Sequence, residues 1–314
     1  MRIRYRFLAA VVPLSVALLA SACSSSSPSS ASGSSGSGGS KIVAVGAENE
    51  YADVIGQVGG KYVQASAIMS NPNTDPHTFE ASASVAREVS AAQLVVQNGV
   101  GYDGFMNTIE NAAPSSSRKV ITVQNLLGLP TDTPNPHLWY KPVTMPAVAN
   151  AVAADLAALQ PAHASYFKAN AAAFISSLTA WNNAMAAFKA KYANTPVATT
   201  EPVADYMLQA VGADNMTPWA LQADIMNGTD PSAQDVATQR SLFTQHKVKV
   251  FLYNQQVTDS LTESFITLAQ QNGIPVVGVY ETMPVPGYDY QSWMLAEVQA
   301  LQKAVTSKVS TEHL

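Results

Sequence analysis

The chain has one cysteine, few charges and no cluster of basic residues. Its 314 residues include only Cys23 as a thiol, which excludes an intrachain disulfide and a metal site built from cysteines. Charged residues make up 12% of the chain, about half of the usual fraction, whereas apolar residues make up 47%. This balance excludes a wholly disordered chain and allows a large core. A net charge of -5, without a Lys/Arg run after Arg6, argues against nucleic acid binding.

The first 40 residues are predicted to be an export signal followed by a linker. Arginines at positions 2, 4 and 6 precede an apolar stretch over residues 7–20, which is too short for a transmembrane helix. Residues 24–40 are almost entirely serine and glycine, a composition typical of flexible linkers. We therefore predict a signal peptide over residues 1–22 and a linker over residues 23–40.

The residues that end at Cys23 resemble the lipobox of bacterial lipoproteins. They read Leu19-Ala20-Ser21-Ala22-Cys23, with Ala20 where lipoproteins more often have leucine. The resemblance implies that Cys23 becomes the lipidated N-terminus of the mature chain, anchored to the outer face of the bacterial cell membrane. Several acyl chains, as lipoproteins carry, would suffice for stable anchoring. A buried or chance cysteine is the alternative.

From Lys41 onward, short β-branched runs alternate with alanine-rich helical stretches. Buried strands are predicted at residues 42–45, 94–96, 120–123, 248–253 and 274–280, with a helix at residues 258–271. Such alternation predicts βα units with parallel sheets. At roughly 100 to 200 residues per domain, the length fits two such units.

A long helix is predicted between the two units. Pro161 can occupy a first helical turn, and residues 162–192 contain neither glycine nor proline but carry an apolar stripe at helical spacing. Thirty-one residues would extend about 46 Å, enough to cross a two-lobed protein. We therefore place an N-terminal αβ lobe at residues 41–160, a linking helix at 161–192 and a C-terminal αβ lobe at 193–314.

Two of the five histidines share a setting. His77 and His137 each follow a proline, which fixes the backbone in an extended or turn shape and presents the imidazole from a loop. Taken alone, each is more often an ordinary loop histidine than a ligand. Because the Pro-His pair occurs twice in one lobe, both residues become candidates for a shared site.

Two glutamates in the second lobe also occupy matching positions. Glu201 follows a short strand that ends at Thr200, and Glu281 follows the strand that ends at Tyr280. Ligand sites in open αβ sheets lie at the carboxyl ends of strands. A carboxylate in this position can equally cap the next helix, because the helix N-terminus favours negative charge. The residues alone leave both interpretations open.

The order of these motifs resembles that of one family of solute-binding proteins. Asp75-Pro76-His77, then the run LVVQNGVGYD over residues 94–103, then Pro136-His137-Leu138-Trp139 is similar to the metal-binding lipoproteins of ABC importers. This family, cluster A-I or cluster 9, comprises manganese and zinc solute-binding proteins. Residues 199–201 (TTE), with a tyrosine five residues on, are similar to its third ligand motif, and Glu281 falls where its last carboxylate ligand lies. The resemblance extends over residues 41–309.

The resemblance implies both a fold and a ligand set. The implied fold is α/β, with two βα lobes with parallel sheets joined by one long rigid α-helix and the metal site in the cleft between the lobes. The implied ligands are His77, His137, Glu201 and Glu281. The chain departs from the family where Asn135 replaces a frequent aspartate, where Pro202 replaces a common glycine, and at the fourth ligand, which is usually aspartate in manganese binders.

This ligand set suits a divalent cation. Two carboxylates cancel the charge of the ion, which offsets the cost of removing it from water. Oxygen-rich donors favour Mn2+ over Cu+, and we expect Mn2+ in preference to Zn2+, with Fe2+ possible. Raw affinity follows the Irving–Williams order, so Zn2+ should bind at least as tightly in vitro.

The predicted function is that of a monomeric, extracytoplasmic binding protein that captures Mn2+ or Zn2+ for an ABC permease and is not an enzyme. The alternative is a secreted metallohydrolase that uses the same His/Glu site. It lacks support because the sequence has no His-Glu-x-x-His helix and no Ser/Cys nucleophile motif. A two-lobed module for another solute or for adhesion is a third interpretation.

Overall fold

The computed structural model describes residues 40–73, 75–284 and 286–314, and residues 40–314 form one compact unit. The predicted signal peptide, Cys23 and the linker up to residue 39 lie outside the described residues. Within the part that is described, no helix combines the length and the apolar character needed to cross a membrane.

The first lobe is built on a four-stranded parallel sheet with the order β2-β1-β3-β4. Its strands are β1 (Ile42–Glu48), β2 (Val63–Met69), β3 (Leu94–Gln97) and β4 (Lys119–Thr122). Both faces are covered. Val45 and Val95 pack with residues of α2 (Ala83–Ala91) and α3 (Gly104–Ala112), and the alternate residues pack with α1 (Asn49–Gly59) and α5 (Thr144–Leu159).

The second lobe repeats this plan with the strand order β6-β5-β7-β8, again parallel. Its strands are β5 (Pro196–Thr199), β6 (Asp214–Asn215), β7 (Val250–Asn254) and β8 (Val276–Val279). One face packs on α9 (Trp219–Met226), α10 (Ala233–Thr244) and α11 (Ser260–Gln271), and the other on α8 (Asp205–Val211) and α12 (Tyr290–Ser307). The prediction of two βα lobes with parallel sheets is confirmed.

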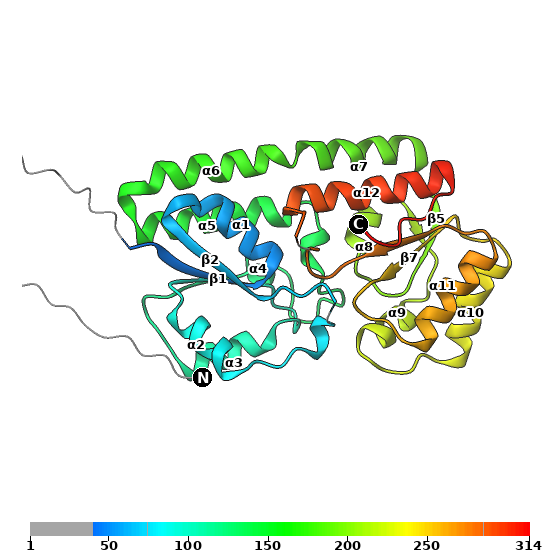
Figure 1. The fold of residues 1–314 in the computed structure, drawn as a ribbon, viewed down its shortest axis with the longest axis horizontal. Helices are drawn as coiled ribbons and strands as arrows, with labels where there is room; N and C mark the ends of the chain where they lie inside the picture. The colour runs from blue at the N-terminus through cyan, green and yellow to red at the C-terminus, as the bar shows by residue number, and fades with distance from the viewer. Residues whose placement is uncertain (1–39, 74, 285) are drawn as a thin grey trace, which may run out of the picture. The chain divides into compact units, whose positions relative to one another are not determined.

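The linking segment is helical, but the structure differs from a single uninterrupted helix. It consists of α6 (Ala164–Ser177) and α7 (Thr179–Tyr192), which meet at Leu178 and run along both lobes (Figure 1). The Ser177 hydroxyl donates to the Phe174 carbonyl and the Thr179 hydroxyl to the Ser176 carbonyl, at 2.7 and 2.6 Å. Such side-chain bonds compete with the backbone ladder and bend helices, which explains the interruption.

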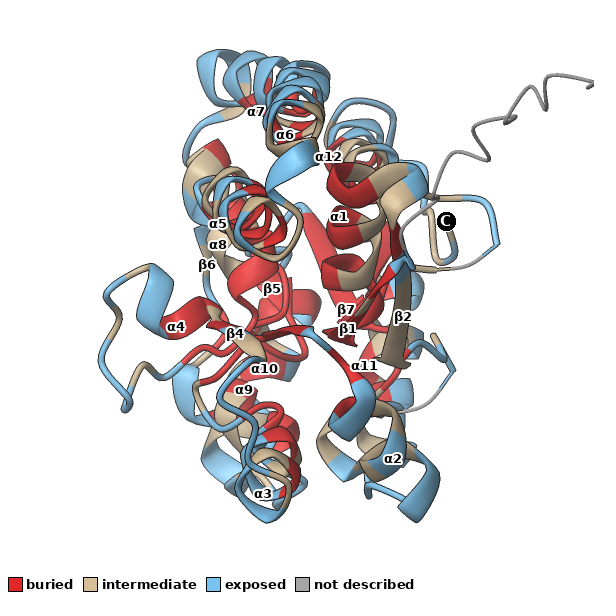
Figure 2. Cartoon of the chain, turned by 90° about the vertical axis from the view of Figure 1, so that its left-hand side faces the viewer, coloured by how far each residue is buried: buried red, intermediate tan, exposed pale blue. Residues whose placement is uncertain are grey.

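A continuous apolar core joins the two lobes along this helical side. It contains residues of both sheets, such as Ala44 and Val250, together with Phe167 of α6, Phe188 of α7 and Trp293 of α12. Figure 2 shows the buried strands enclosed by helices whose outer faces are exposed. The lobes are therefore held together by packing as well as by their linking segment.

The remaining elements are short. They are the helical turn α4 (Val123–Leu126) and the 3-10 helices η1 (Gly60–Tyr62), η2 (Pro76–Thr78), η3 (Leu138–Tyr140) and η4 (Pro161–His163). Two of these 3-10 helices lie at the candidate histidines. η2 includes His77, and η3 begins directly after His137.

Candidate metal centre

The backbone around His77 is fixed by the aspartate two residues before it. The Asp75 carboxylate accepts a hydrogen bond from the His77 amide at 2.8 Å, and Pro76 occupies the first position of η2. This turn directs the imidazole toward the second lobe, where its Nε2 lies 3.1 Å from Oε2 of Glu281. The His77 side chain is 19% exposed.

His137 is fully buried, and a single side chain orients both its backbone and its ring. Oδ1 of Asn135 accepts from the His137 amide at 3.0 Å and lies 2.8 Å from His137 Nδ1. Nδ1 therefore carries the proton, and Nε2 presents a free lone pair on the opposite side of the ring. Asn135 thus orients the ring although an aspartate is frequent at its position in the family that the sequence resembles. Its own Nδ2 donates to the Pro202 carbonyl at 2.7 Å.

Glu281 is the residue on which the two histidines converge. It follows β8, and its amide donates to Oε1 of Gln256 at 2.7 Å. Its Oε2 lies 3.1 Å from His77 Nε2 and 3.3 Å from His137 Nε2, and also accepts from the Tyr102 hydroxyl at 2.8 Å. One potential ligand atom from each of these three residues lies within 4.8 Å of the others.

Glu201 lies beside this cluster, but it does not belong to the group of three. It follows β5 and is 2% exposed. Nδ2 of Asn254 donates to both carboxylates, at 3.3 Å to Glu201 Oε1 and at 2.5 Å to Glu281 Oε1. The other oxygen of Glu201, Oε2, is buried without a hydrogen-bond partner among the described residues. A buried, unpartnered oxygen on a carboxylate that shares Asn254 with Glu281 fits the donor set of a divalent metal ion.

Neither glutamate caps a helix. The helix after Glu201, α8, has Ala204 at its N-cap without a side-chain bond, and α12 is capped by Asp289, whose carboxylate accepts from the Ser292 amide at 2.9 Å. The capping interpretation is therefore wrong for both residues. The carboxylate of Asp289, which follows Glu281 in the chain, is engaged as this cap.

The sequence did not indicate Asn254, which the sheet places between the two glutamates. Glu201, Asn254 and Glu281 lie at the carboxyl ends of β5, β7 and β8, and β7 is the middle strand of these three. Asn254 closes a buried strand just as the glutamates do. Its position relative to that strand was the signal that could have identified it.

The charges in the centre depend strongly on one another. Burial raises the pKa of Glu281, but the two imidazoles outweigh this effect and hold its pKa well below the usual range. For Glu201, burial and then the charge of Glu281 raise the pKa well above the usual value. Burial lowers the pKa of His137, whereas for His77 the attraction of Glu281 exceeds the effect of burial and raises the pKa.

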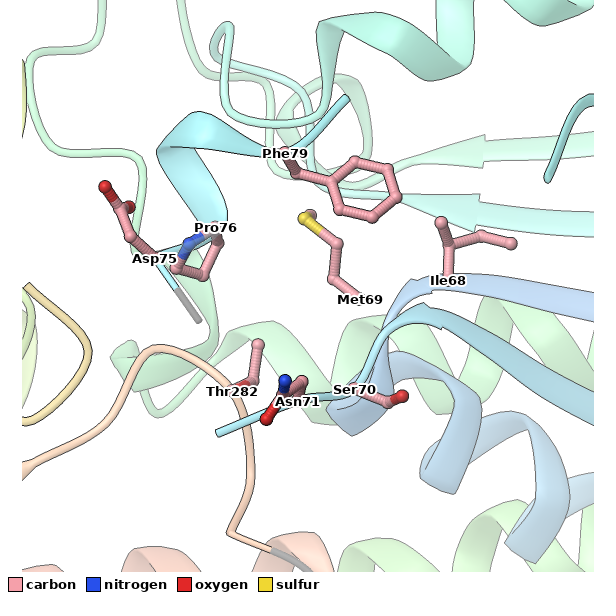
Figure 3. Close-up of a pocket in the computed structure, with 8 residues that line it drawn as sticks. All are labelled: Ile68, Met69, Ser70, Asn71, Asp75, Pro76, Phe79 and Thr282. Atoms are coloured by element: carbon pink, nitrogen blue, oxygen red, sulfur yellow. The ribbon is translucent and has the colours of Figure 1, made fainter. Parts of the chain in front are cut away.

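Two cavities adjoin the centre. One of about 250 Å³ lies between the loop of Asp75 and Thr282, the residue after Glu281, with Met69 and Phe79 in its lining (Figure 3). The other, of about 300 Å³, is lined by His77 and Tyr102 on one side and by residues at the end of α9 on the other. Solvent therefore reaches the centre at His77, the one candidate ligand that is partly exposed.

Comparisons with known proteins agree with this architecture. Manganese-binding lipoprotein MntA of Bacillus subtilis is 21% identical over 239 residues, which cover 72% of this chain and 74% of the relative. Among solved structures, the periplasmic zinc binding protein TroA of Treponema pallidum matches with a TM-score of 0.71 at 17% identity, covering 86% of this chain and 100% of that one. The binding protein FpvC of Pseudomonas aeruginosa, solved in complex with Mn2+, matches with a TM-score of 0.69 at 20% identity, covering 86% and 100%.

A family model also matches most of the chain. The model described as ZnuA, zinc-uptake complex component A periplasmic, matches residues 45–304. This segment begins within β1 and contains the other strands of both sheets, the linking helices and all four candidate ligands. The chain therefore belongs to the ZnuA family.

Proposed function

We propose that this protein captures one divalent transition metal ion, Mn2+ or Zn2+, outside the cytoplasm and delivers it to an ABC import permease. The observation that carries the proposal is the convergence of His77, His137 and Glu281, with ligand atoms within 4.8 Å of one another, beside the unpartnered Oε2 of Glu201. These four residues are the proposed ligands.

The chain's own residues prepare this site for a cation. Asn135 fixes the tautomer of His137, and Tyr102 and Asn254 orient the carboxylate of Glu281. The two carboxylates supply two negative charges in a place that burial makes costly for an uncompensated charge. A bound dication would neutralise these charges, and the imidazole nitrogens that hold it must be deprotonated to do so.

Delivery to a permease and attachment to the membrane are the further parts of the proposal. Membership of a family described as a zinc-uptake component, and similarity to a manganese-binding lipoprotein, support transport as the purpose of binding. The lipobox-like residues that end at Cys23 support a lipid anchor on the outer face of the bacterial cell membrane. The proposal also includes that the chain acts as a monomer. Cys23→Ala should then move the protein from the membrane fraction to the soluble fraction, and mass spectrometry should find acyl chains only in the wild type.

The alternative, a secreted metallohydrolase, has little to support it. A catalytic metal keeps an open position for water beside a general base. Here three of the four proposed ligands are at most 2% exposed, and Tyr102 and Asn254 fill the space beside Glu281 with hydrogen-bond donors. The relatives named above are described as metal-binding proteins.

Elemental analysis and titration test the proposal. Protein purified without chelator should contain Mn2+ or Zn2+, and stripped protein should take up one equivalent of either ion without hydrolysing generic esters or phosphates. A stripped protein that binds neither ion would rule the function out. Metal-dependent hydrolysis at a substantial rate would favour the metallohydrolase.

A further inference from the structure

The described chain starts at the edge of the first sheet where all four of its parallel strands begin. The side-chain amide of Gln160 donates to the Ser40 carbonyl at 3.0 Å, which places this start beside η4 and the beginning of α6 (Figure 1). Ile42 pairs with Val63, so η1, which precedes Val63, lies at the same edge. His77 follows the opposite end of β2. The chain therefore enters the first lobe at the edge that is remote from the metal centre.

A group of half-buried aromatic side chains covers this edge. The ring of His163 stacks on that of Tyr62, with centroids 3.7 Å apart, and Tyr166 meets Tyr62 edge to face at 5.1 Å. The ammonium group of Lys61 lies 5.1 Å from the centre of the Tyr62 ring. Tyrosine rings, which combine an apolar body with a polar hydroxyl, are enriched in proteins at the interface between lipid and water.

Three exposed lysines make the same edge positively charged. Lys41 precedes β1, Lys61 belongs to η1, and Lys168 lies near the start of α6. None of the three has an aspartate or glutamate within six positions in the sequence, and none forms an ion pair with another described residue. Basic residues in such a position are attracted to anionic lipid headgroups.

The rest of the chain is acidic. Arg118, just before β4, has Glu110 near it, which offsets its charge. Asp155 does the same for Lys119, the first residue of β4. Without the three arginines of the predicted signal peptide, the sequence contains 14 basic and 22 acidic residues, a net charge of -8. An anionic surface therefore repels the molecule as a whole and attracts the edge that carries the three exposed lysines.

We propose that this edge of the first lobe lies against anionic phospholipid headgroups of the membrane to which a lipid on Cys23 anchors the chain. The inference rests on the lipid anchor that is part of the proposed function. Cys23 and Ser40 are 17 positions apart, and a serine- and glycine-rich chain of that length spans roughly 20 to 25 Å on average. The linking helices α6 and α7 extend about 43 Å beyond this edge. The anchor therefore keeps the edge with the lysines nearer to the headgroups than the second lobe.

Fluorescence quenching on vesicles tests this orientation. The lipid occupies the sulfur of Cys23, the only cysteine, so a single introduced cysteine can be labelled with a fluorophore. Ser165→Cys places the label beside the aromatic group, and Thr244→Cys places it at the end of α10 in the second lobe, both at exposed positions. The full acylated chain should be inserted into vesicles of phosphatidylglycerol and phosphatidylcholine that carry a quencher on a few headgroups.

Two lysine variants complete the experiment. The first combines Lys41→Gln, Lys61→Gln and Lys168→Gln, which remove the positive charge of the edge. The matched control combines Lys189→Gln, Lys191→Gln and Lys303→Gln, which remove three exposed lysines from the end of α7 and from α12. Both variants change only exposed side chains and lose the same charge, so they differ in where the charge is lost.

The Ser165→Cys label should be quenched and the Thr244→Cys label should not. This quenching should be lost in the first lysine variant and on vesicles of phosphatidylcholine alone, and it should be kept in the matched control. Equal quenching of the two labels, or quenching that both lysine variants keep, would overturn the inference. No quenching of either label would also overturn it and would leave the edge to a protein partner, since these vesicles contain no permease. Absence of acyl chains on Cys23 in mass spectrometry would refute the anchor together with this inference, whereas metal capture is tested separately by titration.

Discussion

At the scale of single residues, the two histidines are held in different ways. His137 is fully buried, and its ring is fixed by Asn135, whereas His77 is partly exposed on a short turn beside a cavity. An ion that enters the proposed site from solvent would therefore meet His77 first. His137 lies on the buried side of the site.

Removal of either imidazole should weaken metal binding. His77→Ala and His137→Ala should each lower the affinity for Zn2+ more than tenfold, because each deletes one of the four proposed donors. Isothermal titration of the stripped variants measures the effect. His163→Ala is the control and should bind metal like the wild type. This variant removes a histidine of η4 whose ring stacks on Tyr62. Unchanged affinity in both site variants would show that the ion binds elsewhere.

The sequence predicted the candidate ligands better than their surroundings. The Pro-His pairs and the glutamates at strand ends stood out because their local setting restricts what they can do. Asn254 and Gln256 did not, since asparagine and glutamine satisfy backbone groups in many loops. Their role depends on which strands become neighbours, and only the order β6-β5-β7-β8 places Asn254 between the glutamates.

At the scale of elements, α12 has a capped N-terminus and also contacts the first lobe. Its N-terminus is capped by Asp289 through a reciprocal pair of bonds with Ser292, and its first residue, Tyr290, donates from its hydroxyl to the Trp139 carbonyl of the other lobe at 2.6 Å. The loop between Glu281 and this cap connects the site to the helix.

Asp289→Ala should therefore reduce stability and leave metal binding intact. Loss of an N-cap costs about 1 kcal/mol of unfolding free energy, which urea denaturation can measure. Glu281→Ala, in contrast, should lower the metal affinity more than tenfold. If Asp289→Ala abolished metal binding while Glu281→Ala did not, the assignment of the fourth ligand would be wrong.

A buried glutamate on the same helix makes stability depend on pH. Burial raises the pKa of Glu297 to about 8, although Trp293 and Tyr140 donate to its Oε1 at 3.1 and 3.2 Å. In the unfolded chain its pKa is about 4.3. Because the folded protein keeps this proton and the unfolded chain loses it, the contribution to stability is complete below about pH 4.3 and is lost as the pH rises through about 8.

Glu297→Gln should remove this loss. The variant should be more stable than the wild type at pH 8, by at most about 5 kcal/mol, and similar to it near pH 4. Urea denaturation at several pH values measures the difference. Glu263→Gln, at an exposed position on α11, should leave the slope between pH 5 and pH 8 as in the wild type. The same slope in the Glu297 variant would mean that this residue is ionised when buried.

Elements with a clear apolar pattern could be predicted, and others could not. The predicted buried runs became β1, β3, β4, β7 and β8. Strand β2 (VQASAIM) was missed because four of its seven residues are small or polar, and β6 because it is only two residues long. The interruption at Leu178 depends on the hydroxyls of Ser177 and Thr179, which donate to carbonyls three residues earlier. The spacing of apolar residues does not predict such hydrogen bonds.

At the scale of the whole molecule, the described lobes are tied together around the site. One apolar core runs through both lobes, and Asn49 of the first lobe exchanges two hydrogen bonds with the backbone of Met283 in the second, at 2.8 and 2.9 Å. The proposed ligands come from both lobes, so an ion that bridges them should stabilise the fold.

Metal should accordingly raise the unfolding temperature. A ligand at a thousandfold excess over its Kd stabilises the native state by about 4.1 kcal/mol. Differential scanning calorimetry of stripped protein with and without Zn2+ should show this shift, which a chelator should reverse. His137→Ala should show a much smaller shift at the same concentration. An equal shift in that variant would indicate stabilisation from another site.

Anomalous diffraction from crystals of the zinc-loaded protein would locate the bound ion. We expect one strong zinc peak per chain in contact with Nε2 of His77, Nε2 of His137, Oε2 of Glu281 and a carboxylate oxygen of Glu201. A peak that contacts other side chains, or the absence of any peak at this position in loaded crystals, would contradict it.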